Sequence, residues 1–205
     1  MKRKDPLYER ADDAAGAGSL RDDELAALAA GDQRLTVLYG GDGKLVAVDK
    51  GQRAIGRLGA LQPEHQGIAL LDPCIAETCD GVWHIVAEGS RRSWRFSVRR
   101  PSSYVEVASA MRHRWRLGLY DVWIAPDHWH RLQFSMFGEG GTLSDAAGNR
   151  IARLVCRPMQ SPVAVVDTFA HPTPGPAPSL LLLLALRIGI FDASTKVVPA
   201  GGGGG

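Results

Sequence analysis

Short apolar runs separated by Gly, Asp, Asn and Pro dominate the chain from Arg34 onward. Turn signals recur about every eight to twelve residues, which is the spacing that all-β barrels and sandwiches produce. No repeat of fixed length is strict enough for a propeller or a solenoid. The pattern therefore predicts a mainly β domain built from successive antiparallel hairpins.

Three hairpins have the clearest signals. Residues 34–49 place two β-rich runs around the glycine-rich turn "GGDG", and residues 141–158 place two runs around "DAAGN". Residues 82–100 pair two further runs across "EGS". In the second of these runs, apolar and basic side chains alternate in "WRFSVR", which predicts a strand with one apolar and one basic face.

The segments around this β region differ in composition. Residues 1–33 are rich in Ala, Gly and Asp, and we expect a partly disordered extension with a short helix between Ser19 and Gly31. Residues 171–178, "HPTPGPAP", are typical of a stiff extended connector. Residues 193–205 end in a run of glycines and are expected to form a flexible tail.

The most apolar stretch is "SLLLLLALRIGIFD", residues 179–192. A helix over 180–191 would span roughly 18 Å, whereas the hydrocarbon core of a bilayer is about 30 Å thick, so this helix cannot cross alone. Arg187 is a further argument against a membrane span. Leucine favours a helix over a strand, and a helix that is apolar on nearly every side must be surrounded by protein. In an otherwise β chain, a barrel is the obvious enclosure.

The order of "LSDAAGNRIARLVCRP", "VAVVDTF" and "SLLLLLALRIGIFD" resembles the tubby C-terminal-like superfamily, which includes tubby-like proteins, phospholipid scramblases and LURP-one-related proteins. This resemblance covers residues 34–192 and implies a closed antiparallel β-barrel around a central helix at 180–191. Two positions stay open for Arg187: near the barrel mouth, where its guanidinium group reaches solvent, or in the interior, where this fold requires a carboxylate partner for it. Scramblase activity is not expected, because the chain lacks the spanning segment and the cysteine-rich region of that branch.

Charge and cysteine content narrow the function classes. Lys plus Arg number 24 against 22 for Asp plus Glu, so the net charge of +2 does not indicate a polyanionic partner for the whole molecule. No targeting signal is readable at the start of the chain, so a cytoplasmic location is expected. Cys74, Cys79 and Cys156 form no CxxC pair, which favours reduced thiols over disulfides or a structural zinc site.

Arginines cluster in "RRSWRFSVRR" and "RHRWRL". If both stretches are strands, the side chains expected to share strand faces are Arg95 with Arg99, and Arg112 with Arg114 and Arg116. Guanidinium groups match phosphate geometry, and the resemblance to tubby-like proteins, some of which bind phosphoinositides, favours anionic phospholipid headgroups as the ligand. We therefore predict a non-enzymatic, membrane-peripheral binding module. The alternative is that these arginines only solvate the barrel and pair with acids.

Two other functions stay open. Tryptophans interleaved with the arginines are also compatible with stacking on single-stranded nucleic acid. His128 and His130 share a strand face, which allows an enzyme or small-ligand carrier at the barrel mouth. The next acid, Glu139, is too far along the chain for a cupin-like metal site. No hydrolase, metalloprotease or phosphate-loop motif is present, so we assign no catalytic residue, metal or cofactor.

Overall fold

The computed structural model describes residues 34–40, 44–60, 74–78, 81–89, 93–101, 103, 105–136, 140–157, 160–169 and 178–197, and for residues 60, 178 and 195–197 it describes the backbone alone. The predicted N-terminal extension with its helix, the connector up to residue 177 and the glycine-rich end from residue 198 lie outside these residues. Cys79, Arg91 and Arg92 lie outside them as well.

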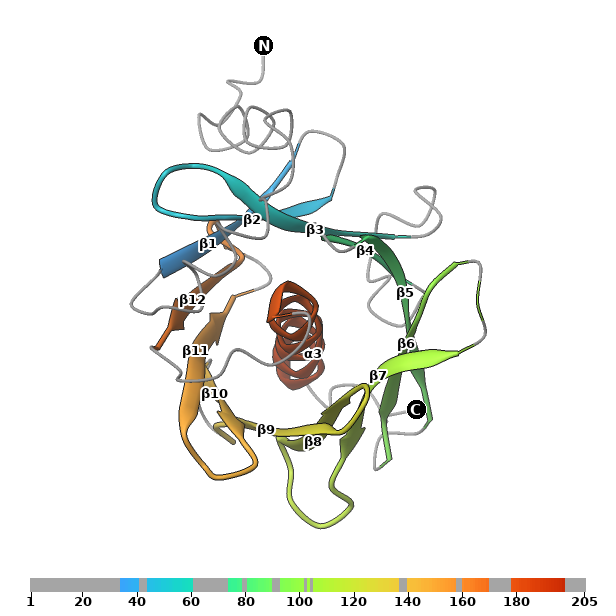
Figure 1. Ribbon diagram of the computed structural model, residues 1–205. Helices are drawn as coiled ribbons and strands as arrows, with labels where there is room; N and C mark the ends of the chain where they lie inside the picture. The colour runs from blue at the N-terminus through green and yellow to red at the C-terminus, as the bar shows by residue number, and fades with distance from the viewer. Residues whose placement is uncertain are drawn as a thin grey trace, which may run out of the picture.

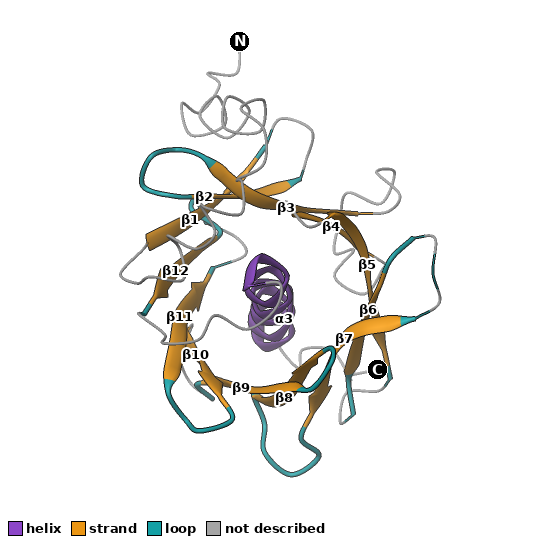
Figure 2. Ribbon diagram, in the orientation of Figure 1, coloured by secondary structure: helices purple, strands orange, loops and turns teal. Residues whose placement is uncertain are grey.

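Among the described residues, twelve strands pair in sequence order and form one closed antiparallel barrel (Figure 1, Figure 2). The last strand returns to the first, from Arg34 opposite Asp167 to Val37 opposite Ala164. The predicted closed barrel is therefore confirmed. The strands are β1 (Arg34–Tyr39), β2 (Leu45–Val48), β3 (Ala54–Ala60), β4 (Cys74–Thr78), β5 (Gly81–Glu88), β6 (Arg95–Arg99), β7 (Glu106–Arg112), β8 (Leu119–Ile124), β9 (His128–Phe134), β10 (Gly140–Asp145), β11 (Arg150–Cys156) and β12 (Ala164–Thr168).

Side chains alternate between the barrel interior and the solvent along the strands. In β11, Ala152, Leu154 and Cys156 are buried, whereas Arg153 is exposed and Val155 is half-buried. This period of two is the one that the hydrophobic pattern predicts, because successive side chains of a strand point to opposite faces of the sheet. The barrel interior is consequently lined by apolar side chains.

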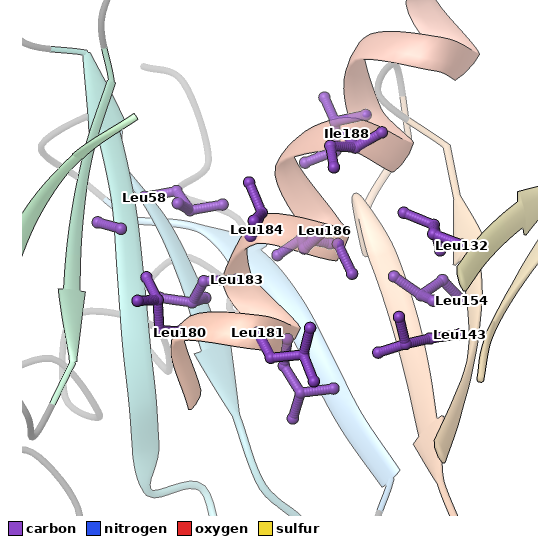
Figure 3. Packing of buried hydrophobic residues seen from close by; sticks show 14 of the residues in the cluster. Leu58, Leu132, Leu143, Leu154, Leu180, Leu181, Leu183, Leu184, Leu186 and Ile188 are labelled. Carbon is purple, nitrogen blue, oxygen red and sulfur yellow. The ribbon is translucent and has the colours of Figure 1, made fainter. Parts of the chain in front are cut away.

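The helix α3 (Pro178–Val197) lies in the middle of the barrel (Figure 1, Figure 3). Every residue from Ser179 to Asp192 is buried, as the enclosure of an apolar helix requires. Figure 3 shows leucines of the helix facing leucines of β3 on one side and of β9, β10 and β11 on the other. The helix extends past the predicted 180–191 at both ends, so the prediction of an extended connector was wrong at residue 178 and that of a flexible tail was wrong at residues 193–197. No helix in the described part of the chain has both the length and the hydropathy that crossing a bilayer demands.

Two glycines allow the helix to approach the wall closely. A Cβ atom at Gly56 of β3 would lie 2.7 Å from Cδ1 of Leu183. A Cβ atom at Gly189 of the helix would lie 2.6 Å from Sγ of Cys156 and 3.1 Å from the ring of Phe134. These separations are shorter than van der Waals contact, so a larger side chain at either position would push the helix away from the strands.

Arg187 lies in the barrel interior, which is one of the two positions that the sequence left open. The residue is only 5% exposed, and the helix continues for a further ten residues to Val197. The structure therefore excludes the alternative in which its guanidinium group reaches solvent. A position in the middle of the helix places the group among interior side chains, where it needs polar contacts.

We expect Gly189→Val to lower the free energy of unfolding by about 1–3 kcal/mol, because added methyl groups in a filled core force neighbouring side chains out of their preferred rotamers. Urea titration followed by tryptophan fluorescence measures this change. Gly140→Ala is the control, since its Cβ atom would meet only the Leu154 carbonyl oxygen, at 3.5 Å. Equal unfolding midpoints for the two variants would contradict close packing of the helix against β9 and β11.

Candidate functional site

The two ends of the barrel carry different side chains. Because the strands alternate in direction, one end collects the last residues of β7, β9 and β11 and the first residues of β8, β10 and β12. This end, which we call the arginine end, holds Arg112, the turn of residues 113–118 and Arg157, which follows β11. His128, the first residue of β9, belongs to the opposite end.

The turn of residues 113–118 connects β7 to β8 and exposes its apolar side chains. It is closed by hydrogen bonds from the Leu119 amide to the Arg116 carbonyl, at 3.2 Å, and from the His113 amide to the Leu119 carbonyl, at 2.9 Å. Trp115 is 86% exposed and Leu117 is 55% exposed. The Arg114 guanidinium group lies 5.1 Å from the centre of the Trp115 ring, in a cation–π contact.

An open cleft of about 1000 Å³ lies beside this turn, over the outer surface of β9, β10 and β11. We call it the arginine cleft. It brings together residues that are far apart in the sequence. Its polar side chains come from the turn, from β9, β10 and β11, and from the residues that follow β9 and β11. They are Arg116, Gln133, Ser135, Thr142, Arg153 and Arg157.

The arginine cleft is suited to an anion. Three guanidinium groups line it, and no acidic side chain does so among the described residues. Arg116 and Arg153 form no ion pair with another described residue. Guanidinium groups donate paired hydrogen bonds to phosphate or carboxylate oxygens, and Thr142 adds a neutral donor, whereas Nε2 of Gln133 already donates to the Phe134 carbonyl, at 3.1 Å. The described lining therefore has the chemistry that an anionic group requires.

Arg95 and Arg99 lie on the outer face of β6, as predicted from the alternation of "WRFSVR". Arg95 is already neutralised, since its Nη2 atom donates to both carboxylate oxygens of Glu106, at 2.7 and 2.9 Å. Nη2 of Arg99 lies 3.4 Å from the hydroxyl oxygen of Ser97. The alternative interpretation, in which the arginines pair with acidic side chains, is therefore correct for Arg95.

The expectation that Arg112, Arg114 and Arg116 share one strand face was wrong. β7 ends at Arg112, and the other two residues belong to the turn, where side chains no longer alternate between two faces. Arg112 is half-buried beside Tyr120, while Arg114 and Arg116 are exposed. Of the five predicted arginines, the structure places only Arg116 in the arginine cleft.

Sequence reasoning missed Arg153 and Arg157 as partners of Arg116. Both follow the alternation of "RIARLVCR", which was visible as a strand with exposed basic positions. Both residues are far from Arg116 in the sequence, and only the pairing of β9, β10 and β11 brings them beside the turn. The sequence alone therefore could not predict that the three arginines lie close together.

His128 and His130 share a face of β9 but differ in environment. His128 is exposed at the start of the strand, and His130 is buried. Within the described part of the chain, no group of three or more His, Cys, Asp or Glu side chains could hold a metal ion. Both histidines lie toward the end of the barrel opposite the arginine cleft, so they do not contribute to it.

A second group of polar side chains lies inside the barrel, near the arginine end. The Arg187 guanidinium group interacts with the Cys74 thiol, and the Tyr120 hydroxyl lies 3.4 Å from Oδ1 of Asp192. Burial raises the pKa of Cys74 despite the neighbouring cation. Burial, followed by the charge of Asp192, raises the pKa of Tyr120 well above its usual range. Both groups are therefore held neutral by the interior.

Comparisons with known proteins do not assign a family. No protein-family model matches the chain, and no curated protein matches it. Among solved structures, the chain is similar to an X-ray structure of a protein from Arabidopsis thaliana, with 13% sequence identity and a TM-score of 0.49. The match covers 82% of this chain and 93% of the Arabidopsis chain.

The raised pKa values of Tyr120 and Cys74 predict a loss of stability in alkali. A group whose pKa is higher in the folded than in the unfolded state contributes stability below its unfolded pKa, and this contribution declines as the pH rises above that value. The decline should begin near about pH 8.5 for the thiol and about pH 10 for the phenol. In Tyr120→Phe, the free energy of unfolding should therefore fall less steeply with pH above about pH 10. In Cys74→Ala, it should fall less steeply above about pH 8.5.

Urea titrations at a series of alkaline pH values measure these slopes. Tyr39→Phe is the control for Tyr120→Phe, because Tyr39 is only half-buried. If Tyr120→Phe and the unmodified protein show the same slope above pH 10, the buried phenol does not resist ionisation as described.

Proposed function

We propose that this protein is a non-enzymatic binding module that recognises anionic phospholipid headgroups at a membrane surface through the arginine cleft. The observation that supports it is the convergence of Arg116, Arg153 and Arg157 on one open cleft whose described lining lacks acidic side chains. A phosphate group is the ligand chemistry that several guanidinium groups bind best. The proposed site is thus partly different from the predicted one.

The form of the cleft supports a headgroup over a deeply enclosed metabolite. Its polar groups lie on the outside of the sheet, because β9, β10 and β11 point their other side chains at the helix. A ligand there keeps one side in solvent, as a headgroup attached to a bilayer must. Arg114 and Arg112, at the same end, add positive charge that strengthens attraction to an anionic surface.

We further propose that the chain is a distant member of the tubby C-terminal-like superfamily, as its sequence resemblance implies. The support is the shared architecture, a closed antiparallel barrel around a C-terminal apolar helix. Folds host many functions, so the proposed ligand rests on the cleft and not on this relationship. The expected location, the cytoplasmic surface of a membrane, belongs to the same proposal.

Vesicle co-sedimentation tests the proposed function. The protein should bind phosphatidylcholine vesicles that contain phosphatidylserine or a phosphoinositide and should bind pure phosphatidylcholine vesicles weakly. Arg153→Glu should reduce binding to the anionic vesicles by at least about tenfold, because it removes one charge contact and adds a repulsive one, each worth about 1 kcal/mol near the surface. Binding should also weaken as the salt concentration rises.

Arg150→Glu is the matched control, since it makes the same change of charge on the same strand. Arg150 is exposed but is the first residue of β11, at the end away from the cleft. A general attraction of a cationic protein to anionic vesicles would weaken equally in both variants. Equal losses for Arg153→Glu and Arg150→Glu would therefore dismiss the arginine cleft as the binding site.

A further inference from the structure

Exposed apolar side chains gather around the arginine cleft. Trp115 and Leu117 lie in the turn of residues 113–118, and Met136, which is 55% exposed, lies two residues after the end of β9. Large apolar side chains exposed together and flanked by polar groups mark surfaces that contact a partner or a membrane. All three contribute to the lining of the same cleft as the arginines.

We propose that the turn of residues 113–118 enters the interfacial layer of a lipid bilayer, with Trp115 and Leu117 as the inserted side chains. This inference rests on the proposed function, because it places the phosphate held by the arginine cleft at headgroup depth. Tryptophan is enriched at this depth because its ring is apolar while its N–H group forms hydrogen bonds. Leu117 supplies apolar area that can enter the boundary with the acyl chains.

The geometry of the turn suits insertion. Two backbone hydrogen bonds close it, so its tip is already ordered and little conformational entropy is lost on binding. Arg114 stacks over the Trp115 ring, and its long side chain allows the cation to stay with the phosphates while the ring goes deeper. The turn therefore presents a cation and an exposed apolar ring in contact with each other.

A bilayer fits this surface better than a nucleic acid does. Stacking on bases would engage Trp115, but Leu117 and Met136 have no π-face to offer a base. A bilayer uses all three side chains together with the arginines, since apolar burial and attraction to anionic lipids add in interfacial binding. The combination of apolar side chains and arginines therefore favours a lipid surface over a nucleic acid.

Brominated lipids measure the insertion directly, because bromine quenches tryptophan fluorescence only at short range. Anionic vesicles with brominated acyl chains should quench part of the fluorescence of the unmodified protein, and Trp115→Phe should abolish that quenching. Trp115→Ala combined with Leu117→Ser should weaken vesicle binding by at least about tenfold, as expected when the apolar area of these side chains no longer leaves water. Thermal unfolding checks that the exposed substitutions leave the fold intact.

Trp129→Ala is the matched control, since Trp129 is 54% exposed but lies in β9 toward the opposite end of the barrel. It should leave both quenching and vesicle affinity unchanged. Quenching that persists in Trp115→Phe, or equal loss of affinity in the Trp129 and Trp115 variants, would overturn the insertion. Loss of binding to a single-stranded oligonucleotide in Trp115→Ala with unchanged vesicle binding would overturn it in favour of a nucleic-acid partner.

Further measurements separate this inference from the proposed function. Arg153→Glu should bind inorganic phosphate less well than the unmodified protein does. If Arg153→Glu leaves phosphate and headgroup binding unchanged while Trp115 is still quenched, the proposed function fails and insertion stands. If the arginine variant loses binding and Trp115 is not quenched by vesicles that do bind the protein, the cleft stands and insertion fails.

Discussion

Enclosure of one apolar helix is the constraint on which the rest of the structure depends. Side chains from Ser179 to Asp192 are buried on every side of α3, so the helix is stable only if protein surrounds it completely. A closed barrel meets this requirement and also leaves no unpaired strand edge, because β12 pairs with β1. Glycines at positions 56 and 189 then set how closely the wall and the helix pack.

Filling the barrel with its own helix moves the candidate chemistry to the outside. The interior polar groups, among them Arg187, Cys74 and Tyr120, contact one another or the helix and are shielded from solvent. The open cleft of the described structure lies instead on the outer surface of β9, β10 and β11, at the end where the turn of residues 113–118 projects. Because the helix fills the interior, the surfaces of such a barrel that a ligand can reach are its rim and its outer wall.

The arginines illustrate why a local cluster in sequence is an incomplete guide to a site. Arg95 and Arg99 follow strand alternation and lie where the pattern placed them, but Arg95 is neutralised by Glu106. The end of β7 at Arg112 separates that residue from Arg116, because alternation stops where the strand stops. Arg153 joins Arg116 only through the pairing of three strands, a relationship that neither local density nor spacing records.

The sequence by itself determined the fold class, since the turn spacing, the period of two and a leucine-rich segment too short to cross a bilayer together require a β enclosure around a helix. It also determined which side chains of β6 face outward. Only the tertiary structure decided how deeply Arg187 is buried, which arginines form ion pairs and which residues line the cleft. The physical reason is that burial, ion pairing and convergence depend on which distant segments lie side by side, whereas periodicity depends on neighbouring residues alone.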